Sequence, residues 1–98
     1  MAERGPQGLY IAECFLPGVD AAAVRELDAR ASGTAAELTS GGEPVSYHGS
    51  LLMREDEVLL CLFEGSEQAV RKAAGQAGVP FERIQPADSS PRPITDTT

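Results

Sequence analysis

The sequence predicts an α+β fold, in which an antiparallel sheet of four strands carries two helices. Three observations indicate this fold. Short apolar runs end at glycine, proline or charged residues, which is typical of strands. A long alanine-rich segment repeats its apolar side chains at helical spacing, and a second, shorter segment does the same before a glycine. The elements therefore follow the order strand, helix, strand, strand, helix, strand.

The first strand and the first helix are predicted between residues 9 and 42. Leu9–Leu16 is an apolar run with aromatic and β-branched residues, too short for a typical helix, and it ends at a Pro-Gly pair. Asp20 is positioned to cap the helix, because its carboxylate can accept hydrogen bonds from the free amides of the first turn. Gly33 interrupts the helix at a cost of about 1 kcal/mol relative to alanine. The apolar stripe nevertheless stays in phase across it: Val24, Leu27, Ala31, Ala35 and Leu38.

The remaining elements are a hairpin of two strands, a second helix and a last short strand. The hairpin strands are Val45–Met53 and Glu57–Glu64, with three polar residues between them. Ser66 caps the second helix and Gly78 ends it. The final strand is Arg83–Ala87. Right-handed crossovers then place the first and third strands at the centre of the sheet and both helices on one face, which is the ferredoxin-like βαββαβ sandwich.

Length and composition allow one small domain. The chain has 98 residues, of which 42% are hydrophobic, so it can bury a core of its own. All predicted elements fall within residues 8–87. Residues 1–7 are expected to form a flexible lead-in, and residues 88–98, which are rich in Ser, Pro, Thr and Asp, a disordered tail.

The charge of the chain bears on its partners. The formal net charge is -7, which argues against nucleic acid as a partner, since phosphate binding relies on clustered Lys and Arg. No basic amphipathic segment favours a membrane surface either. An acidic chain suits a metal ion or a cationic or neutral ligand. The two cysteines outside any C-x-x-C pair, the lack of a signal peptide and the lack of a spanning apolar run predict a cytoplasmic protein.

The predicted central strands are apolar on both faces. In the third strand, Leu60 and Leu62 point to one side, and Leu59 and Phe63 point to the other. A sheet with one exposed face should alternate apolar and polar residues instead. The open face is therefore expected to be buried against a second copy of the chain, which predicts a homodimer.

Polar side chains interrupt these apolar strands. In the simplest register of the hairpin, Met53 pairs with Glu57. Tyr47 then pairs with Phe63. Side chains of equal parity share a face, and this face collects Ser46, His48, Ser50 and Glu64.

His48 and Glu64, within side-chain reach of each other, admit three interpretations. They are an acid/base pair, or they are two ligands of a metal ion, for which imidazole nitrogen favours zinc, nickel or copper. The other ligands would then come from a dimer interface, from Glu13 or from water. In the third interpretation the pair is structural, with a half-exposed histidine and a carboxylate in solvent.

Glu13 lies in the first strand, which is expected to be central and buried. A buried carboxylate is costly unless it is paired, protonated or ligating. Its partner is Arg25, Arg83 or a ligand, or the side chain reaches water at the end of the strand. Tyr10 and Tyr47 either offer hydroxyls to a cavity or pack their rings and satisfy the hydroxyls locally.

Several segments together carry a family resemblance, and they cover roughly residues 8 to 86. They are the hairpin Val45–Met53 and Arg54–Glu64, the segments Ser66–Ala74 and Ala77–Ile84, and the first strand with its ending Glu13–Pro17. The chain resembles in these segments a bacterial family of small ferredoxin-like proteins, most of them known as a domain of unknown function and some as nickel-binding proteins. The resemblance implies a dimeric α+β barrel, in which two sheets face each other around a central cavity.

These inferences predict a binding protein. The expected function is a small cytoplasmic dimer that holds a metal ion, with nickel as a candidate, or a small ligand in the barrel interior. Glu13, His48 and Glu64 are the expected metal contacts, and the ligand pocket is expected to include Tyr10, Ser46, Tyr47 and Ser50. The alternative is a cofactor-independent enzyme of the monooxygenase or cyclase type acting on a small molecule in secondary metabolism, by analogy of fold. A structural or regulatory dimer without chemistry is the third hypothesis.

Overall fold

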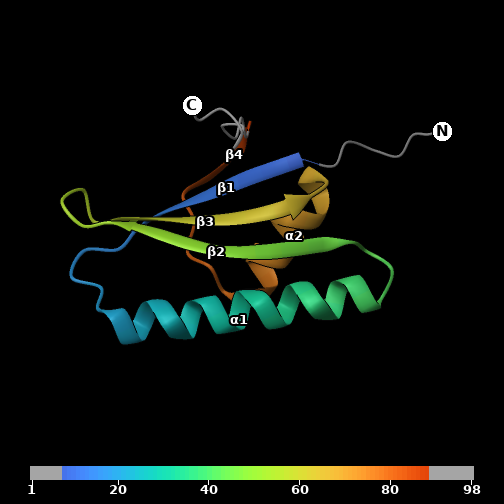
Figure 1. Cartoon of the computed structure of the whole chain (residues 1–98), viewed down its shortest axis with the longest axis horizontal. Helices are drawn as coiled ribbons and strands as arrows, with labels where there is room; N and C mark the ends of the chain where they lie inside the picture. Colours follow the sequence, from blue (N-terminus) through green and yellow to red (C-terminus); the bar gives the residue numbers. More distant parts are fainter. Residues whose placement is uncertain (1–7, 89–98) are drawn as a thin grey trace, which may run out of the picture.

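A computed structural model of the chain describes residues 8–88 and shows four strands and two helices in the predicted order (Figure 1). The elements are β1 (Gly8–Phe15), α1 (Ala21–Ser40), β2 (Val45–Met53), β3 (Val58–Gly65), α2 (Glu67–Ala77) and β4 (Arg83–Ala87). All pairings are antiparallel, and the strands lie in the order β2-β3-β1-β4. The predicted α+β fold, with β1 and β3 at the centre, is therefore confirmed. The predicted lead-in and all of the predicted tail except Asp88 lie outside the described residues.

Both helices begin at the predicted caps. The Asp20 carboxylate accepts a hydrogen bond from the backbone N–H of Ala23 at 2.8 Å. The Ser66 hydroxyl likewise accepts from the N–H of Ala69 at 3.1 Å. Gly78 ends α2 in the left-handed conformation with φ of 75°, which glycine adopts without steric cost. α1 continues through Gly33 as a single helix, as its apolar stripe predicts.

The core lies between the two helices and the inner face of the sheet. The sheet supplies most of its volume, and these side chains have no solvent exposure: Ala12, Cys14, Leu59, Cys61 and Phe63. The helices supply mainly alanine, with Leu27 and Val70 as the larger residues: Ala31, Ala35, Ala69, Ala73, Ala74 and Ala77. Small residues let the helix backbones approach the sheet, so the larger strand side chains fill the space at close packing.

One polar cluster connects α1 to β2 on this inner face. The Tyr47 hydroxyl donates a hydrogen bond to Oδ1 of Asp28 at 2.5 Å. The Ser50 hydroxyl donates to the same oxygen at 2.8 Å. Tyr47 also packs its ring against Phe63, with ring centroids 4.9 Å apart. Two strand residues are thus tied to one helix carboxylate.

A β-bulge in β2 changes the predicted register. The pairing of Tyr47 with Phe63 is confirmed, but Met53 pairs with Val58, and the predicted partner Glu57 is wrong. The register shifts between Tyr47 and Ser50, where Gly49 has φ of 100°. An extra residue in one strand of a pair shifts every later residue to the other face.

The bulge therefore decides which face receives the second half of β2. Ser50 pairs with Cys61 and Leu52 with Leu59, so both turn toward the helices. Leu51 and Met53 turn to the open face, where they are 57% and 46% exposed. The expectation that Ser50 shares a face with His48 is accordingly wrong.

Replacing Gly49 is expected to destabilise the protein because of the backbone conformation at this position. A Cβ atom at this position would meet nothing within 4 Å, so the cost of Gly49→Ala is the strain of the left-handed region, about 1–2 kcal/mol. Gly33→Ala is the matched control, since its site is equally open and lies in a helix, where alanine gains up to about 1 kcal/mol. Urea unfolding measures both. A Gly49→Ala protein as stable as wild type would contradict the bulge.

Asp28 is expected to stabilise the contact between α1 and β2. Asp28→Ala leaves the hydroxyls of Tyr47 and Ser50 without their acceptor, which should cost about 1–3 kcal/mol of unfolding free energy. Glu26→Ala, an exposed acidic residue of the same helix, is the control and should change little. Equal effects of the two substitutions in urea unfolding would show that the cluster does not stabilise the fold.

The stability should also fall at alkaline pH because of Tyr47. Burial and the hydrogen bond with Asp28 raise the pKa of Tyr47 above its ordinary value, which is about 10 in an unfolded chain. Above about pH 10 the unfolded chain releases this proton before the native state does. The contribution of Tyr47 to the free energy of unfolding is therefore full below that pH and is lost as the pH rises. Between about pH 9 and 11, Tyr47→Phe should lose less unfolding free energy than wild type. An equal loss in both proteins would exclude Tyr47 as the cause.

Candidate functional site

The open face of the sheet carries the candidate site. It is the face opposite the helices. Successive side chains of a strand point to opposite faces of the sheet, so this face carries the strand side chains that do not point into the core. Most of these side chains are apolar and partly or largely exposed: Leu9, Ile11, Phe15, Leu51, Met53, Val58, Leu60 and Leu62. Phe15 is 52% exposed. The two-sided apolar pattern of the central strands is thus present in the structure.

His48 and Glu64 form a pair on this face. Nε2 of His48 lies 2.8 Å from Oε1 of Glu64. The two side chains are 46% and 57% exposed, so solvent reaches both. His48 comes directly before Gly49 at the bulge, and Ser46 pairs with Glu64 from the neighbouring position. The sequence prediction that His48 and Glu64 meet is therefore confirmed, and Ser46 lies beside them.

Glu13 belongs to a separate cluster on the same face. Its Oε2 atom accepts a hydrogen bond from Nε of Arg83 at 3.0 Å and another from the side-chain amide of Gln85. Arg83 is one of the partners that the sequence predicts, and the carboxylate is 24% exposed. Gln85 has the same parity as Arg83 in β4, which is the signal that would have found it.

The two clusters do not meet within one chain. Along β3, Glu13 lies opposite Leu60, whereas Glu64 is four residues further on, which corresponds to roughly 13 Å. Among residues 8–88, no three His, Cys, Asp or Glu side chains are grouped so that they could hold a metal ion. Within this part of the chain, His48 and Glu64 are therefore two donors without a third, and the role of Glu13 as a ligand stays a prediction.

The predicted pocket residues divide between the two faces. Tyr10 packs against the core from the helix side, and the hydroxyls of Tyr47 and Ser50 are used by Asp28. Ser46 is on the open face with Glu64. These four residues therefore do not surround one space. Asp28 is not among the residues predicted from the sequence, although it continues the inward stripe of α1 at helical spacing: Val24, Asp28, Ala31 and Ala35.

The two cysteines lie in the core as neighbours on β1 and β3. Cys14 and Cys61 occupy diagonal positions of the ladder and have no solvent exposure. Their mutual hydrogen bond and burial raise the pKa of the Cys14 thiol, while the same bond lowers that of Cys61 against the effect of burial. Because neither sulfur is accessible, the pair is not available to a substrate in solution.

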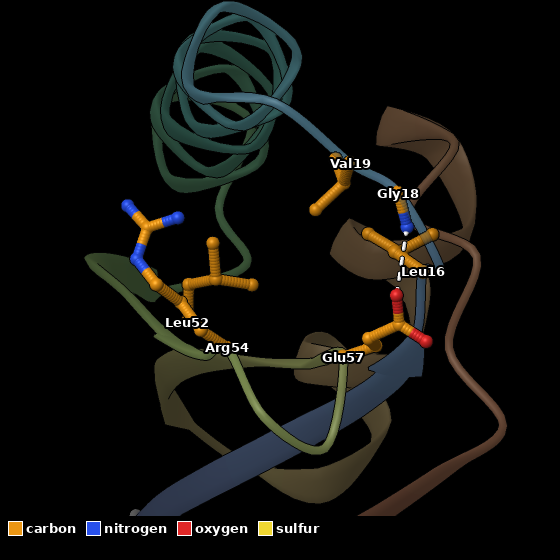
Figure 2. A pocket seen from close by; sticks show the side chains of 6 residues that line it. All are labelled: Leu16, Gly18, Val19, Leu52, Arg54 and Glu57. Carbon is orange, nitrogen blue, oxygen red and sulfur yellow. Dashed lines mark hydrogen bonds between the residues drawn. The ribbon is translucent and has the colours of Figure 1, made fainter.

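A small cavity lies where the hairpin approaches the start of α1 (Figure 2). It has a volume of about 80 Å³ and is lined by Leu16, Gly18, Val19, Leu52, Arg54 and Glu57. The Glu57 carboxylate accepts a hydrogen bond from the N–H of Gly18 at 3.2 Å, and its carbonyl accepts from the N–H of Leu16 at 2.8 Å. Glu57 has a positive φ of 57°. These contacts join the hairpin to the loop after β1, so the residues that line this cavity serve to hold the fold together.

A wider hollow lies at the Glu13 end of the open face. It measures about 220 Å³ and is lined by Glu13, Cys14, Phe15, Val58, Glu82 and Arg83. This volume is below the roughly 300 Å³ at which pockets for drug-sized ligands begin.

Within residues 8–88, no helix combines the length and the hydropathy that crossing a bilayer requires.

Comparison with known proteins identifies the family of the chain. A family model described as nickel responsive protein SCO4226-like matches residues 10–86. The match spans both helices and all the strand residues that carry the His48–Glu64 pair and the Glu13 cluster. No curated protein and no solved structure matches the chain. With a match over most of its length, the chain belongs to the SCO4226-like family of nickel responsive proteins.

Proposed function

We propose that this protein binds a divalent metal ion, with nickel as the first candidate, through His48 and Glu64. The observation that carries the proposal is the 2.8 Å approach of an imidazole nitrogen to a carboxylate oxygen on the open face. The family description supports nickel as the ion. Imidazole and carboxylate are donors that suit nickel, zinc and copper, in contrast to the hard oxygen sets that magnesium and calcium prefer.

The spacing of the two donors is compatible with one ion. Metal–nitrogen and metal–oxygen bonds of about 2.1 Å at a right angle put the donor atoms about 3.0 Å apart, close to the observed 2.8 Å. A metal would replace the shared hydrogen bond of the pair. Because both side chains are about half exposed, water can complete the coordination and the ion can enter and leave without unfolding.

Glu64 is better suited to a cation than Glu13 in a single protomer. The Glu13 carboxylate already accepts two hydrogen bonds, one of them from the guanidinium of Arg83 at 3.0 Å. A positive charge at that distance opposes the approach of a metal ion. The corresponding partner of Glu64 is a histidine, which can bind the metal as a neutral imidazole.

In this proposal the protein works as a cytoplasmic homodimer. The pair lies on the apolar face of the sheet, which becomes the interior of a barrel when two copies face each other. The ion would then be held between the sheets, and groups from the second copy would be available as further ligands. The net charge of -7 also attracts cations to the protein.

His48→Ala should abolish specific nickel binding. Loss of a direct ligand is expected to weaken the affinity by at least about 100-fold, since even residues that only orient a ligand account for 10–100-fold. Isothermal titration calorimetry with Ni²⁺ measures the affinity, and Glu64→Gln should show a similar loss. Glu67→Gln is the matched control, because Glu67 forms an equally exposed ion pair on α2.

The single histidine allows a direct assignment of the ligand. Added Ni²⁺, which is paramagnetic in octahedral sites, should broaden the imidazole NMR signals of His48 before those of any other side chain. Unchanged imidazole signals in the presence of one equivalent of nickel, or a His48→Ala protein that binds nickel as wild type does, would refute the proposed site.

A further inference from the structure

We propose that the hollow at the Glu13 end of the open face binds a small zwitterion, an α-amino acid with a branched aliphatic side chain. The hollow measures about 220 Å³ and is lined by Glu13, Cys14, Phe15, Val58, Glu82 and Arg83. It lies apart from the proposed metal site, since Glu13 is opposite Leu60 and Glu64 is four residues further along β3. The inference therefore concerns a second site and does not depend on the metal.

The first argument is the size of the hollow. A water molecule occupies about 30 Å³ in the liquid, so a volume of about 220 Å³ corresponds to roughly seven waters. A branched aliphatic amino acid such as valine has about that many non-hydrogen atoms. A drug-sized ligand, which requires a pocket of roughly 300 Å³ or more, is too large. The hollow is therefore suited to a small metabolite.

The second argument is that two neighbouring rows of the sheet give the hollow a polar wall and an apolar wall. In one row, Glu13 of β1 pairs with Arg83 of β4. In the next row on the same face, Phe15 of β1 pairs with Val58 of β3, and β1 lies between these two strands (Figure 1). Residues two apart on a strand are separated by roughly 7 Å. A ligand of this length can place its charged groups at one wall and its hydrocarbon at the other.

The third argument is that the ion pair of Glu13 and Arg83 leaves atoms of both charges open to a ligand. Nε of Arg83 and the side-chain amide of Gln85 both donate to Oε2 of Glu13. Among residues 8–88, no other side-chain hydrogen bond reaches this pair, so Oε1 of Glu13 and the Nη groups of Arg83 are available. A guanidinium can bind a ligand carboxylate through two hydrogen bonds, and a carboxylate accepts from an ammonium group. The pair therefore suits both charged groups of a zwitterion.

The fourth argument is the second carboxylate of the hollow, that of Glu82. The backbone N–H of Glu82 donates to the carbonyl of Glu13 at 2.7 Å, which holds the start of β4 beside the hollow. The pKa of the Cys14 thiol is raised by its hydrogen bond with Cys61, by burial and also by the charge of Glu82, as expected for a carboxylate near the Cys14 side of the hollow. Two carboxylates and one guanidinium leave an excess of negative charge, which favours the ammonium group and opposes a simple anion.

The apolar wall explains why the ligand should carry an aliphatic side chain. Phe15 is 52% exposed, and the directly opposite Val58 is partly exposed. A branched hydrocarbon placed against them removes apolar surface from water on both sides of the contact, which is favourable in proportion to the area buried. The guanidinium of Arg83, which opposes a metal ion at Glu13, favours a ligand that carries a carboxylate beside its ammonium group.

An NMR titration of the full chain with L-valine tests the inference. A chelating resin first removes metal from protein and buffer, because an amino acid can also bind a metal ion directly. L-Valine is expected to bind saturably, with a dissociation constant on the order of 1 mM for so small a ligand at a partly exposed site. The backbone amide signals of Phe15, Val58 and Glu82, which line the hollow, should shift most.

Three related probes separate the contributions of the parts of valine. Isovalerate lacks the ammonium group, isobutylamine lacks the carboxylate, and glycine lacks the side chain. Each should bind at least about 10-fold more weakly than L-valine, because each leaves a charge or the apolar wall of the hollow without its partner. Isobutylamine that binds as well as L-valine would assign the hollow to a simple cation, and equal binding of glycine would exclude the apolar wall. Either result contradicts the inference.

Arg83→Gln should weaken the binding of L-valine by about 10-fold or more, because it removes the partner of the ligand carboxylate. Arg83 is 66% exposed, so the variant should fold, which circular dichroism checks. Glu82→Gln should also weaken binding, through the loss of a partner for the ammonium group. Arg71→Gln is the matched control, since Nε of Arg71 lies at the same distance of 3.0 Å from a glutamate, Glu67 of α2, and it should leave the affinity unchanged.

Three further results would overturn the inference. The first is the absence of a saturable shift at L-valine concentrations up to about 20 mM. The second is a set of shifts that centres on residues outside the hollow. The third is an Arg83→Gln protein that binds L-valine as wild type does. Because all measurements are made without nickel, failure of the metal site at His48 and Glu64 leaves their outcome unaffected.

Discussion

Two helices can cover only one face of this four-stranded sheet, while its central strands are apolar on both faces. The covered face is closed almost completely: the two largest fully buried side chains, Phe63 and Leu59, come from β3, and the helices contribute mostly alanine. The uncovered face keeps Leu60, Leu62, Phe15 and their neighbours at the surface. This difference in burial between the two faces determines where polar residues are placed and which positions tolerate charge.

Polar residues follow this division. On the inner face, the partly buried hydroxyls of Tyr47 and Ser50 donate hydrogen bonds to the carboxylate of Asp28, so these polar groups are paired where water has limited access. On the open face, Glu13 and Glu64 each have a partner but remain partly exposed. The inner cluster is therefore structural, whereas the outer pairs keep donor atoms that a ligand can reach. In the proposed function the His48–Glu64 pair is the better of the two for a cation, because no Arg or Lys of residues 8–88 forms an ion pair with it, whereas Glu13 is paired with Arg83.

Much of this arrangement could be predicted from the sequence because it depends on local signals. The caps at Asp20 and Ser66, the end of α2 at Gly78 and the bounds of β2 and β4 all follow from residue types and their spacing. The contact between His48 and Glu64 could be predicted because Tyr47 pairs with Phe63 as expected. The register of the hairpin shifts only after this pair, between Tyr47 and Ser50. The family match then confirmed the resemblance.

The errors arose where one backbone conformation changes many contacts. Gly49 reads as an ordinary strand residue, and nothing in the sequence marks its positive φ, so the face of Ser50 and the partner of Met53 were predicted wrongly. The separation of Glu13 from His48 depends on the register between β1 and β3, which a sequence does not state. Asp28 was missed because a charge on an amphipathic helix is expected to face solvent.

The bulge at Gly49 also affects how relatives should be compared with this chain. Before the bulge, the even-numbered residues of β2 face outward; after it, the odd-numbered residues do. A relative that lacks one residue at this point would present its Leu51 and Met53 equivalents to the helices and its Ser50 and Leu52 equivalents to the outer face. An alignment that places this one-residue gap elsewhere in β2 would match side chains from opposite sides of the sheet. Similar residues in those columns would then say nothing about whether the two proteins have a similar outer face.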